Sequence, residues 1–132
     1  MSNIQSRSLI EVHELASELR DFAHVRDWGQ FHSPKNLAMA LTGEVGELVE
    51  IFQWMTEEDS RLALNDPKTA QALRHELADV VMYAVRLADV LAIDLDAAVK
   101  EKLALNGQKY PAELARGTSA KYNELPGGQE TQ

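Results

Sequence analysis

Two short signals, each an N-capping residue followed by proline, divide the middle of this chain into long helices. Ser33-Pro34 and Asp66-Pro67 each place a side-chain acceptor at the N-cap and a proline at the first helical position. Apolar residues recur at helical spacing after both signals, so we expect helices over residues 34–55 and 67–91. No strand-like alternation appears elsewhere in the chain. The signals therefore predict an all-α fold.

The other periodic segments complete a bundle of four main helices and one short helical turn. Apolar spacing indicates a first helix over residues 6–26, and Asp94 caps a fourth that continues to Lys109. Thr56 starts the short turn over residues 56–59. The sequence after Tyr110-Pro111 has no helical periodicity and is read as an extension of the bundle.

The domain organisation follows from the absence of repeats and of any shift in composition. At 132 residues the chain is long enough for one domain with a core of its own. We expect a single all-α domain with its C-terminal extension over residues 1–125. The polar segment 126–132 is expected to be a disordered tail.

The composition excludes several kinds of partner. A net charge of −8 argues against a protein that binds the backbone of polymeric nucleic acid. The longest apolar runs cover only a few residues, so no membrane partner is expected, and the N-terminus lacks the pattern of a secretion signal. The absence of cysteine excludes disulfides and is typical of a cytoplasmic protein, which is the location we expect. A phosphorylated small molecule stays compatible with the charge, because bound divalent cations invert the local field.

Two acidic half-motifs lie on the two long predicted helices. Glu44-Val45-Gly46-Glu47 and Glu76-Leu77-Ala78-Asp79 each separate two carboxylates by three residues, which places each pair on one helical face. Carboxylates gathered by packed helices repel one another unless a cation lies between them. Hard oxygen ligands suit Mg²⁺ or Mn²⁺. The half-motifs therefore indicate metal-assisted phosphate chemistry.

A structural network explains the same acidic residues. Glu44 falls inside the apolar stripe of its helix, and Glu76 borders the stripe of the later helix. Because a buried carboxylate needs a partner, Arg74 or Arg86 could pair with these residues across the bundle. The chain lacks the Glu-x-x-His pairs of a di-iron carboxylate bundle. The residues alone leave the metal site and the structural network as alternatives.

A longer ordered set of residues resembles one known family. The set comprises the segments 26–37 (RDWGQFHSPKNL), 43–48 (GEVGEL), 52–54 (FQW), 76–80 (ELADV) with Tyr83, then Asn106, 109–111 (KYP), 116–117 (RG) and 121–122 (KY). With these residues the chain is similar, from about residue 19 to residue 125, to the dCTP pyrophosphatase branch of the MazG-like nucleotide pyrophosphohydrolases.

The resemblance implies a MazG-type bundle that assembles as a homodimer or as a dimer of dimers, a homotetramer. It also implies an enzyme that hydrolyses dCTP or a related dNTP to the monophosphate and pyrophosphate, which would clean the nucleotide pool. The cofactor would be Mg²⁺, with Mn²⁺ as a possible substitute. The alternatives are the same reaction on dUTP or on dNTPs in general, and a non-catalytic oligomeric helical interaction protein.

The resemblance further implies which residues touch the metal and the nucleoside. Matching positions would place four carboxylates around Mg²⁺, namely Glu44, Glu47, Glu76 and Asp79. Four further residues would surround the base and the sugar, namely Trp28, His32, Trp54 and Tyr83.

The later motifs supply the expected contacts to the phosphates, or a lid over them. These residues are Asn106, Lys109, Arg116, Lys121 and Tyr122. For catalysis, Glu47 is the candidate that activates the attacking water, with Glu76 beside it. Lys109 would stabilise the charge that develops on the leaving phosphates.

Two positions depart from the family's patterns. Gly43 precedes Glu44, where the wider MazG pattern often has two adjacent acids and the dCTP-specific branch does not. Leu19 stands where animal members carry a histidine in the first helix. By this resemblance, the leucine would remove one polar contact to the base or sugar, and with it one determinant of strict dCTP preference.

Overall fold

The computed structural model describes residues 3–127, which divide into two compact units. One unit runs from Val12 to Asp94, and the other combines residues 3–11 with residues 95–127. All regular secondary structure in the described part of the chain is helical, which confirms the all-α fold class. The single domain over residues 1–125 stays a prediction. Of the expected disordered tail, residues 126–127 form a turn, and residues 128–132 lie outside the described residues.

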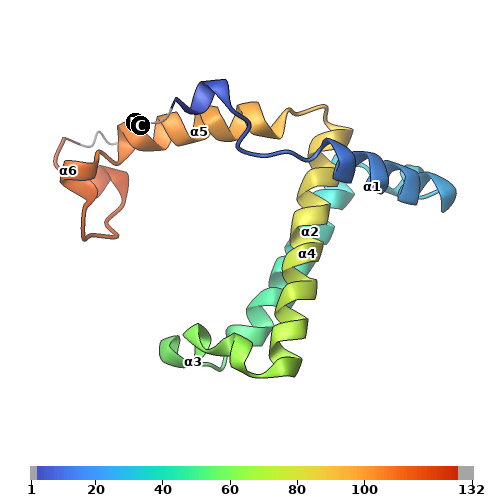
Figure 1. Cartoon of the computed structure of the whole chain (residues 1–132), viewed down its shortest axis with the longest axis horizontal. Helices are drawn as coiled ribbons and strands as arrows, with labels where there is room; N and C mark the ends of the chain where they lie inside the picture. The colour runs from blue at the N-terminus through green and yellow to red at the C-terminus, as the bar shows by residue number, and fades with distance from the viewer. Residues whose placement is uncertain (1–2, 128–132) are drawn as a thin grey trace. The chain divides into compact units, whose positions relative to one another are not determined.

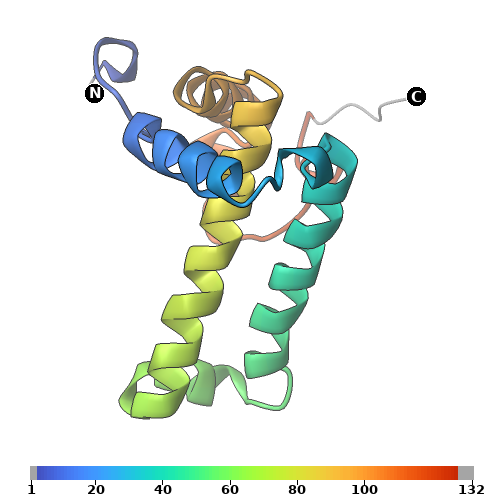
Figure 2. The ribbon, with the colours of Figure 1, turned by 90° about the vertical axis from the view of Figure 1, so that its right-hand side faces the viewer.

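The unit from Val12 to Asp94 is built on a helical hairpin. Its helices are α1 (His13–Val25), α2 (Pro34–Phe52), α3 (Glu57–Arg61) and α4 (Pro67–Val90). The two long helices, α2 and α4, are labelled in Figure 1 and lie side by side in opposite directions, as Figure 2 shows. Figure 2 shows α1 crossing this hairpin near the C-terminal end of α4. The hairpin is the frame on which acidic residues of α2 and α4 can meet.

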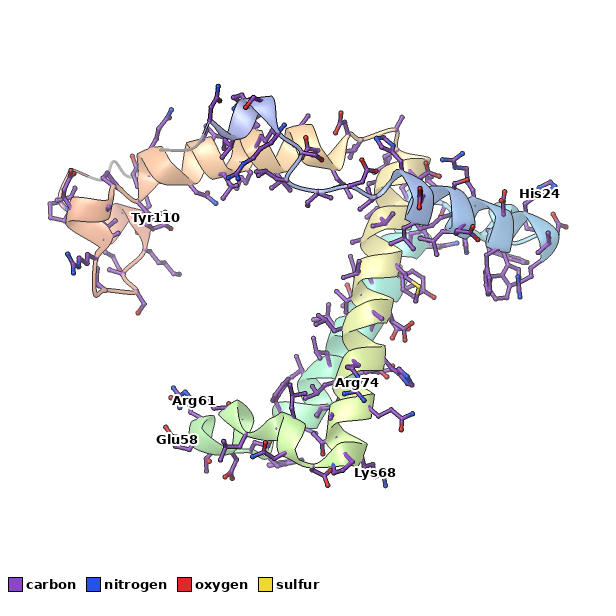
Figure 3. The ribbon with its side chains drawn as sticks, viewed as in Figure 1. His24, Glu58, Arg61, Lys68, Arg74 and Tyr110 are labelled. Atoms are coloured by element: carbon purple, nitrogen blue, oxygen red, sulfur yellow. The ribbon has the colours of Figure 1, made fainter. Side chains whose placement is uncertain are left out.

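The capping signals define where these helices begin. The side chain of Ser33 accepts a hydrogen bond from the backbone N–H of Asn36, and Asp66 accepts one from the N–H of Thr69. Thr56 caps α3 in the same way, so all three predicted helix starts are confirmed. On α3, Arg61 and Glu58 form an exposed ion pair of 2.7 Å (Figure 3). The C-terminal ends differ slightly, because α2 stops at Phe52 rather than residue 55.

The predicted first helix over residues 6–26 was too long at its N-terminal end. The structure has a short 3₁₀ helix at Ile4–Ser6, and α1 begins only at His13. Between them, the backbone N–H groups of Leu9 and Ile10 donate to Asp96 Oδ1 over 2.6 and 3.0 Å. These long-range hydrogen bonds take the place of the intrahelical bonds that apolar spacing predicts. The prediction failed here because local periodicity carries no information about a distant acceptor.

The second unit contains α5 (Leu95–Lys109), α6 (Ala112–Ala115) and a 3₁₀ helix at Tyr122–Glu124. Lys100 Nζ lies 2.8 Å from Asp96 Oδ2. This hydrogen bond, followed by those from the backbone of Ile10 and Leu9, lowers the pKa of Asp96 to about 2. The sequence did not predict α6, because four residues are too few to show a helical period.

Few side chains of the described residues are fully covered. Leu37 is the one large side chain that is almost completely buried, and most of the other buried residues are alanines. In contrast, Val49 on α2 and Leu77 on α4 are each 55% exposed, and Val81 is 46% exposed. Helical spacing places Leu77 in a core-facing stripe, so its exposure differs from the expectation. These exposed apolar side chains are not covered by any other part of the described chain.

None of the helices within residues 3–127 combines the length and the apolar character needed to cross a bilayer.

Candidate metal and nucleotide site

Three acidic side chains meet where α2 and α4 pack together. Glu44 and Glu47 come from successive turns of α2, and Glu76 comes from α4. One carboxylate oxygen of each residue lies within 4.8 Å of those of the other two. The structure thus brings together three of the four carboxylates that were expected to bind the metal. Asp79 is outside this cluster, one turn further along α4 than Glu76.

Two of the three carboxyl groups, those of Glu44 and Glu76, hold a proton more tightly than an isolated carboxyl group does. Hydrogen bonding to Glu47 raises the pKa of Glu76 to about 7, with burial and the charges of Glu47 and Glu44 adding to the effect. Burial, followed by the charge of Glu47, raises the pKa of Glu44. Without a cation, the cluster therefore reduces its mutual repulsion by keeping a proton near neutral pH.

The cluster has the donor set that a divalent cation requires. Glu44 Oε2 and Glu76 Oε2 are buried and have no hydrogen-bond partner within the described residues. Leaving buried carboxylate oxygens unpartnered is costly, and coordination of a cation removes that cost. Several carboxylate oxygens at one point suit the hard cations Mg²⁺ and Mn²⁺. The residues present therefore fit a divalent metal site.

The structural network that the sequence left open is not formed. Arg86 donates to His32 and Asp89 rather than to the glutamates. Arg74 is exposed on α4 (Figure 3), and no ion pair within residues 3–127 involves Glu44 or Glu76. The acidic cluster is therefore not a set of structural ion pairs within this part of the chain.

A cavity of about 290 Å³ lies in the same unit as the acidic cluster. It is formed by α1, the loop before α2, and α4, and it shares α4 with the cluster. Its lining is Leu19, Phe22, Trp28, His32, Asp79, Met82, Tyr83 and Arg86. Three of the residues expected around the base and sugar, Trp28, His32 and Tyr83, thus line one cavity. Asp79, the fourth acidic residue, lines it too.

One wall of the cavity is a chain of ring contacts. The rings of Phe22 and Trp28 meet edge to face with centroids 5.7 Å apart, and Trp28 and His32 follow at 6.3 Å. The guanidinium of Arg26 covers the other end, 3.4 Å from the centroid of Phe22. Such contacts fix the orientation of Trp28 while its side chain stays 43% exposed. The wall is therefore a preformed aromatic surface with room for a flat ligand.

Arg86 is a cavity residue that was not predicted from the sequence, where it was expected only as a partner for the glutamates. Arg86 lines the cavity, and its side chain is 13% exposed. The signal was present in the spacing, because Asp79, Tyr83 and Arg86 recur at helical intervals on one face of α4. That spacing could have placed Arg86 beside the two expected site residues.

Trp54 does not join the cavity of its own chain. It follows the C-terminal end of α2 and is 89% exposed, whereas Trp28 precedes the N-terminal end of the same helix. A helix of 19 residues is about 28 Å long. One chain therefore cannot bring both tryptophans to one nucleotide base, and a role for Trp54 requires a second copy of the chain.

The residues expected to contact phosphates lie in the other unit. Asn106 and Lys109 are on the last turns of α5, and the remaining residues follow it: Arg116, Lys121 and Tyr122. Lys109 Nζ lies 6.0 Å from the centroid of the Tyr122 ring. Asn106 and Tyr122 are half-buried, whereas the three basic side chains are exposed. Their role toward a phosphate stays a prediction.

Comparison with known proteins identifies similar chains. A family model described as the MazG-like family matches residues 40–125. dCTP pyrophosphatase 1 from Homo sapiens is 50% identical over 108 residues, which cover 82% of this chain and 64% of the human protein. The Rattus norvegicus protein of the same name is 48% identical over the same shares. This chain thus spans 64% of the length of these relatives.

A solved structure is also similar. The crystal structure of a pyrophosphatase from Archaeoglobus fulgidus matches with a TM-score of 0.70 and 38% sequence identity. The match covers 80% of this chain and 96% of the archaeal one.

Proposed function

This chain belongs to the MazG-like family, and from that premise we propose that it is a Mg²⁺-dependent nucleotide pyrophosphohydrolase. Its substrate would be dCTP or a related dNTP, cleaved to the monophosphate and pyrophosphate in housecleaning of the nucleotide pool. The observation that carries the proposal is the cluster of three carboxylates with unpartnered buried oxygens. The cluster shares α4 with an aromatic cavity, and Asp79, three residues after Glu76, lines that cavity, so we expect one ligand to contact both. The names of the similar proteins point to the same reaction class. A cytoplasmic location stays part of this proposal.

The acidic residues would bind the triphosphate through the metal. Glu44, Glu47 and Glu76 would hold Mg²⁺, and Asp79 would complete the site from the next turn of α4. The bound metal would neutralise the charge of the phosphates and assist the departure of pyrophosphate. Mn²⁺, with similar ligand preferences, would substitute for it. Metal binding must displace the proton that Glu76 holds near neutral pH.

The reaction itself needs a proton acceptor beside the α-phosphorus. Glu47 is the most exposed member of the cluster, so its free oxygen can face a water molecule. The water oxygen forms a bond to the α-phosphorus and gives its proton to Glu47. The bond from that phosphorus to the oxygen bridging to the β-phosphate breaks, and pyrophosphate leaves. Lys109 would stabilise the charge on the leaving group.

The aromatic cavity would hold the nucleoside. Trp28 and Tyr83 offer ring faces, and His32 offers a polar atom at the cavity wall. Stacking is tolerant of base identity, whereas hydrogen bonds to the polar edge of the base discriminate more sharply. The lining is mostly apolar and contains Leu19, so polar discrimination depends on few side chains. This composition leaves dUTP or other dNTPs as alternative substrates.

The active assembly would contain at least two copies of the chain. The buried residues are mostly alanines, while Val49, Leu77 and Val81 are exposed on the hairpin of α2 and α4. A helical pair with so small a core gains stability when a second copy covers its apolar surface. A second copy could also bring its Trp54 to the cavity. We therefore include a homodimer, or a homotetramer built from it, in the proposal.

A product assay tests the proposed function. The protein is incubated with each of the four dNTPs and with dUTP, in the presence of Mg²⁺ or Mn²⁺, and the products are identified. Monophosphate and pyrophosphate in equal amounts would support the reaction, and the fastest substrate would identify the base. Diphosphate and phosphate, or no turnover with any nucleotide, would contradict it.

A divalent cation should stabilise the folded protein by binding the acidic cluster. At a concentration of Mg²⁺ about 100 times its Kd, binding contributes about 2.7 kcal/mol to the free energy of unfolding. Thermal denaturation with and without Mg²⁺ measures this, and the shift should disappear in Glu44→Gln. Glu50→Gln is the matched control, because Glu50 is exposed on α2 outside the cluster. Equal shifts in both variants would show that Glu44 is not a ligand, and no shift in the wild type would favour the non-catalytic interaction protein.

Replacing Trp28 by alanine should weaken substrate binding rather than the chemical step. Loss of one aromatic stacking surface should raise KM for dCTP by about tenfold or more. The kcat should change by less than about threefold, because Trp28 is not part of the acidic cluster. Steady-state kinetics measures both constants, with Trp28→Phe as the variant that keeps a ring. A drop in kcat at unchanged KM would contradict this role.

A further inference from the structure

Arg86 holds the ring of His32 in one tautomer. Arg86 Nε donates a hydrogen bond of 3.1 Å to His32 Nδ1. Arginine has no acceptor, so Nδ1 must be the unprotonated nitrogen that receives this bond. In a neutral imidazole the hydrogen is then on Nε2. Burial, followed by the charge of Arg86, lowers the pKa of His32, which favours the neutral ring.

The guanidinium is itself held from a second direction. Arg86 NH1 lies 3.3 Å from Asp89 Oδ2, one turn further along α4. Asp89 also accepts a hydrogen bond of 2.9 Å from Arg20 Nε on α1. The side chains of Arg86 and Asp89 are only 13% and 20% exposed. The position of Arg86 is therefore determined by the packing of α1 against α4 and not by solvent.

Arg86 and His32 lie at the part of the cavity that is distant from the acidic cluster. The rise along α4 from Glu76 to Arg86 is about 15 Å. A nucleotide whose phosphates are held at the cluster would therefore direct its base toward Arg86 and His32. His32 lines the cavity, and its Nε2 has no hydrogen-bond partner within the described residues. This nitrogen is thus available to a ligand as a hydrogen-bond donor.

We propose that Arg86 is a positioning residue, which fixes His32 as a neutral ring whose Nε2–H donates to a carbonyl oxygen of a pyrimidine base. This part of substrate recognition rests on the proposed function, whereas the tautomer of His32 does not. The two polar side chains at this end of the cavity, His32 and Arg86, both offer N–H groups. A carbonyl oxygen on the base is the acceptor that matches these donors. Leu19 contributes no polar atom to the cavity, so we expect this donor to contribute to polar discrimination between bases.

Three measurements test the inference on the whole chain. Nitrogen-15 NMR of histidine-labelled protein at about pH 8, where a free imidazole is neutral, reports which nitrogen of His32 is protonated. We expect Nε2–H in the wild type and a mixture of tautomers in Arg86→Met. Calorimetric titration with dCMP should give a Kd about tenfold higher in Arg86→Met, the loss expected for one hydrogen bond. In turnover, KM for dCTP should rise by a similar factor with kcat almost unchanged.

Arg20→Met is the matched control. This substitution removes the same charge from a side chain that also contacts Asp89. Arg20 is, however, 57% exposed and does not line the cavity. His32 should keep its tautomer in this variant, and the Kd for dCMP should stay within about twofold of the wild type.

The outcomes separate this inference from the proposed function. A wild-type His32 protonated on Nδ1 would overturn the inference whatever the enzyme does, and this measurement needs no variant that folds. An altered tautomer in Arg86→Met with unchanged Kd for dCMP would remove the role in base recognition. Absence of turnover with every nucleotide would overturn the proposed function, while the NMR result would still decide whether Arg86 fixes His32.

Discussion

Replacing Glu76 by glutamine should abolish Mg²⁺-dependent hydrolysis of dCTP while stabilising the metal-free protein above neutral pH. The amide supplies one neutral oxygen where the metal needs an anionic ligand, so kcat/KM should fall by about 10³-fold. At the same time glutamine resembles the protonated carboxyl that the folded protein favours, because hydrogen bonding to Glu47 and burial raise the pKa of Glu76 to about 7. Loss of function and gain of stability in one variant are typical of a ligand site under strain.

The pH dependence of stability follows from the same shift. The pKa of Glu76 rises from 4.5 in the unfolded chain to about 7 in the folded one. Between these values the folded state binds more protons, so this contribution is complete below the lower pKa and is lost as pH rises through the upper one. The melting temperature of the metal-free wild type should therefore fall over this range, and that of Glu76→Gln should fall less. Thermal scans in chelator at several pH values measure the difference.

Glu50→Gln serves again as the control for a general loss of negative charge. It should keep the wild-type activity and the wild-type dependence of melting temperature on pH. If Glu76→Gln retained more than a tenth of the wild-type kcat/KM, Glu76 would not be a metal ligand. The melting temperatures of the two metal-free proteins are also compared above neutral pH. A lower value for Glu76→Gln than for the wild type would show that the neighbours of Glu76 do not destabilise its ionised carboxylate.

Placing an arginine at Val81 should dissociate the assembly and remove activity. Val81 is 46% exposed on α4, and Leu77 precedes it by one turn with 55% exposure. If a second copy covers these side chains, a charge there must be desolvated without a partner, at a cost of several kcal/mol. Sedimentation should show monomer or unfolded chain, and dCTP turnover should fall by at least about a hundredfold because the proposed site needs two copies.

Gln71→Arg is the matched control for this experiment, because it adds the same charge at an exposed polar position of α4. It should sediment and react as the wild type does. Complementary evidence comes from Trp54→Ala, which should raise KM for dCTP if a second copy brings that ring to the cavity. A wild-type protein that sediments as a folded, fully active monomer would contradict the assembly and the role of Trp54 together.

The helix starts could be predicted from the sequence because their causes are local. Ser33, Thr56 and Asp66 each bond to a backbone N–H three residues away, so the residue types and the spacing contain the whole interaction. The start of α1 could not be predicted in this way. There the deciding acceptor is Asp96, and no pattern around Leu9 indicates a partner so far along the chain.

The parts of the site that lie on one face of a single helix could be predicted from the sequence, and the parts that depend on distances between elements could not. Glu44 and Glu47 share a face of α2, so their meeting with Glu76 required only that two helices pack. Trp54 shows the limit of this reasoning, because the length of α2 separates it from Trp28 and the sequence contains no measure of that distance. Arg86 was not predicted as a site residue for another reason. Its partner His32 was expected only as a contact to the base and sugar, and its partner Asp89 was not considered.

The contact between Asp96 and residues Leu9 and Ile10 has a consequence for how the protein is made. The unit that contains it is assembled from the two ends of the chain, and the N-terminal strip leaves the ribosome long before its acceptor is translated. At 5–20 residues per second, roughly 4 to 17 seconds separate the synthesis of Leu9 and Ile10 from that of Asp96. The segment from Val12 to Asp94 is complete by then. The order of synthesis thus makes the residues of the hairpin available before the contact of Leu9 and Ile10 with Asp96 can form.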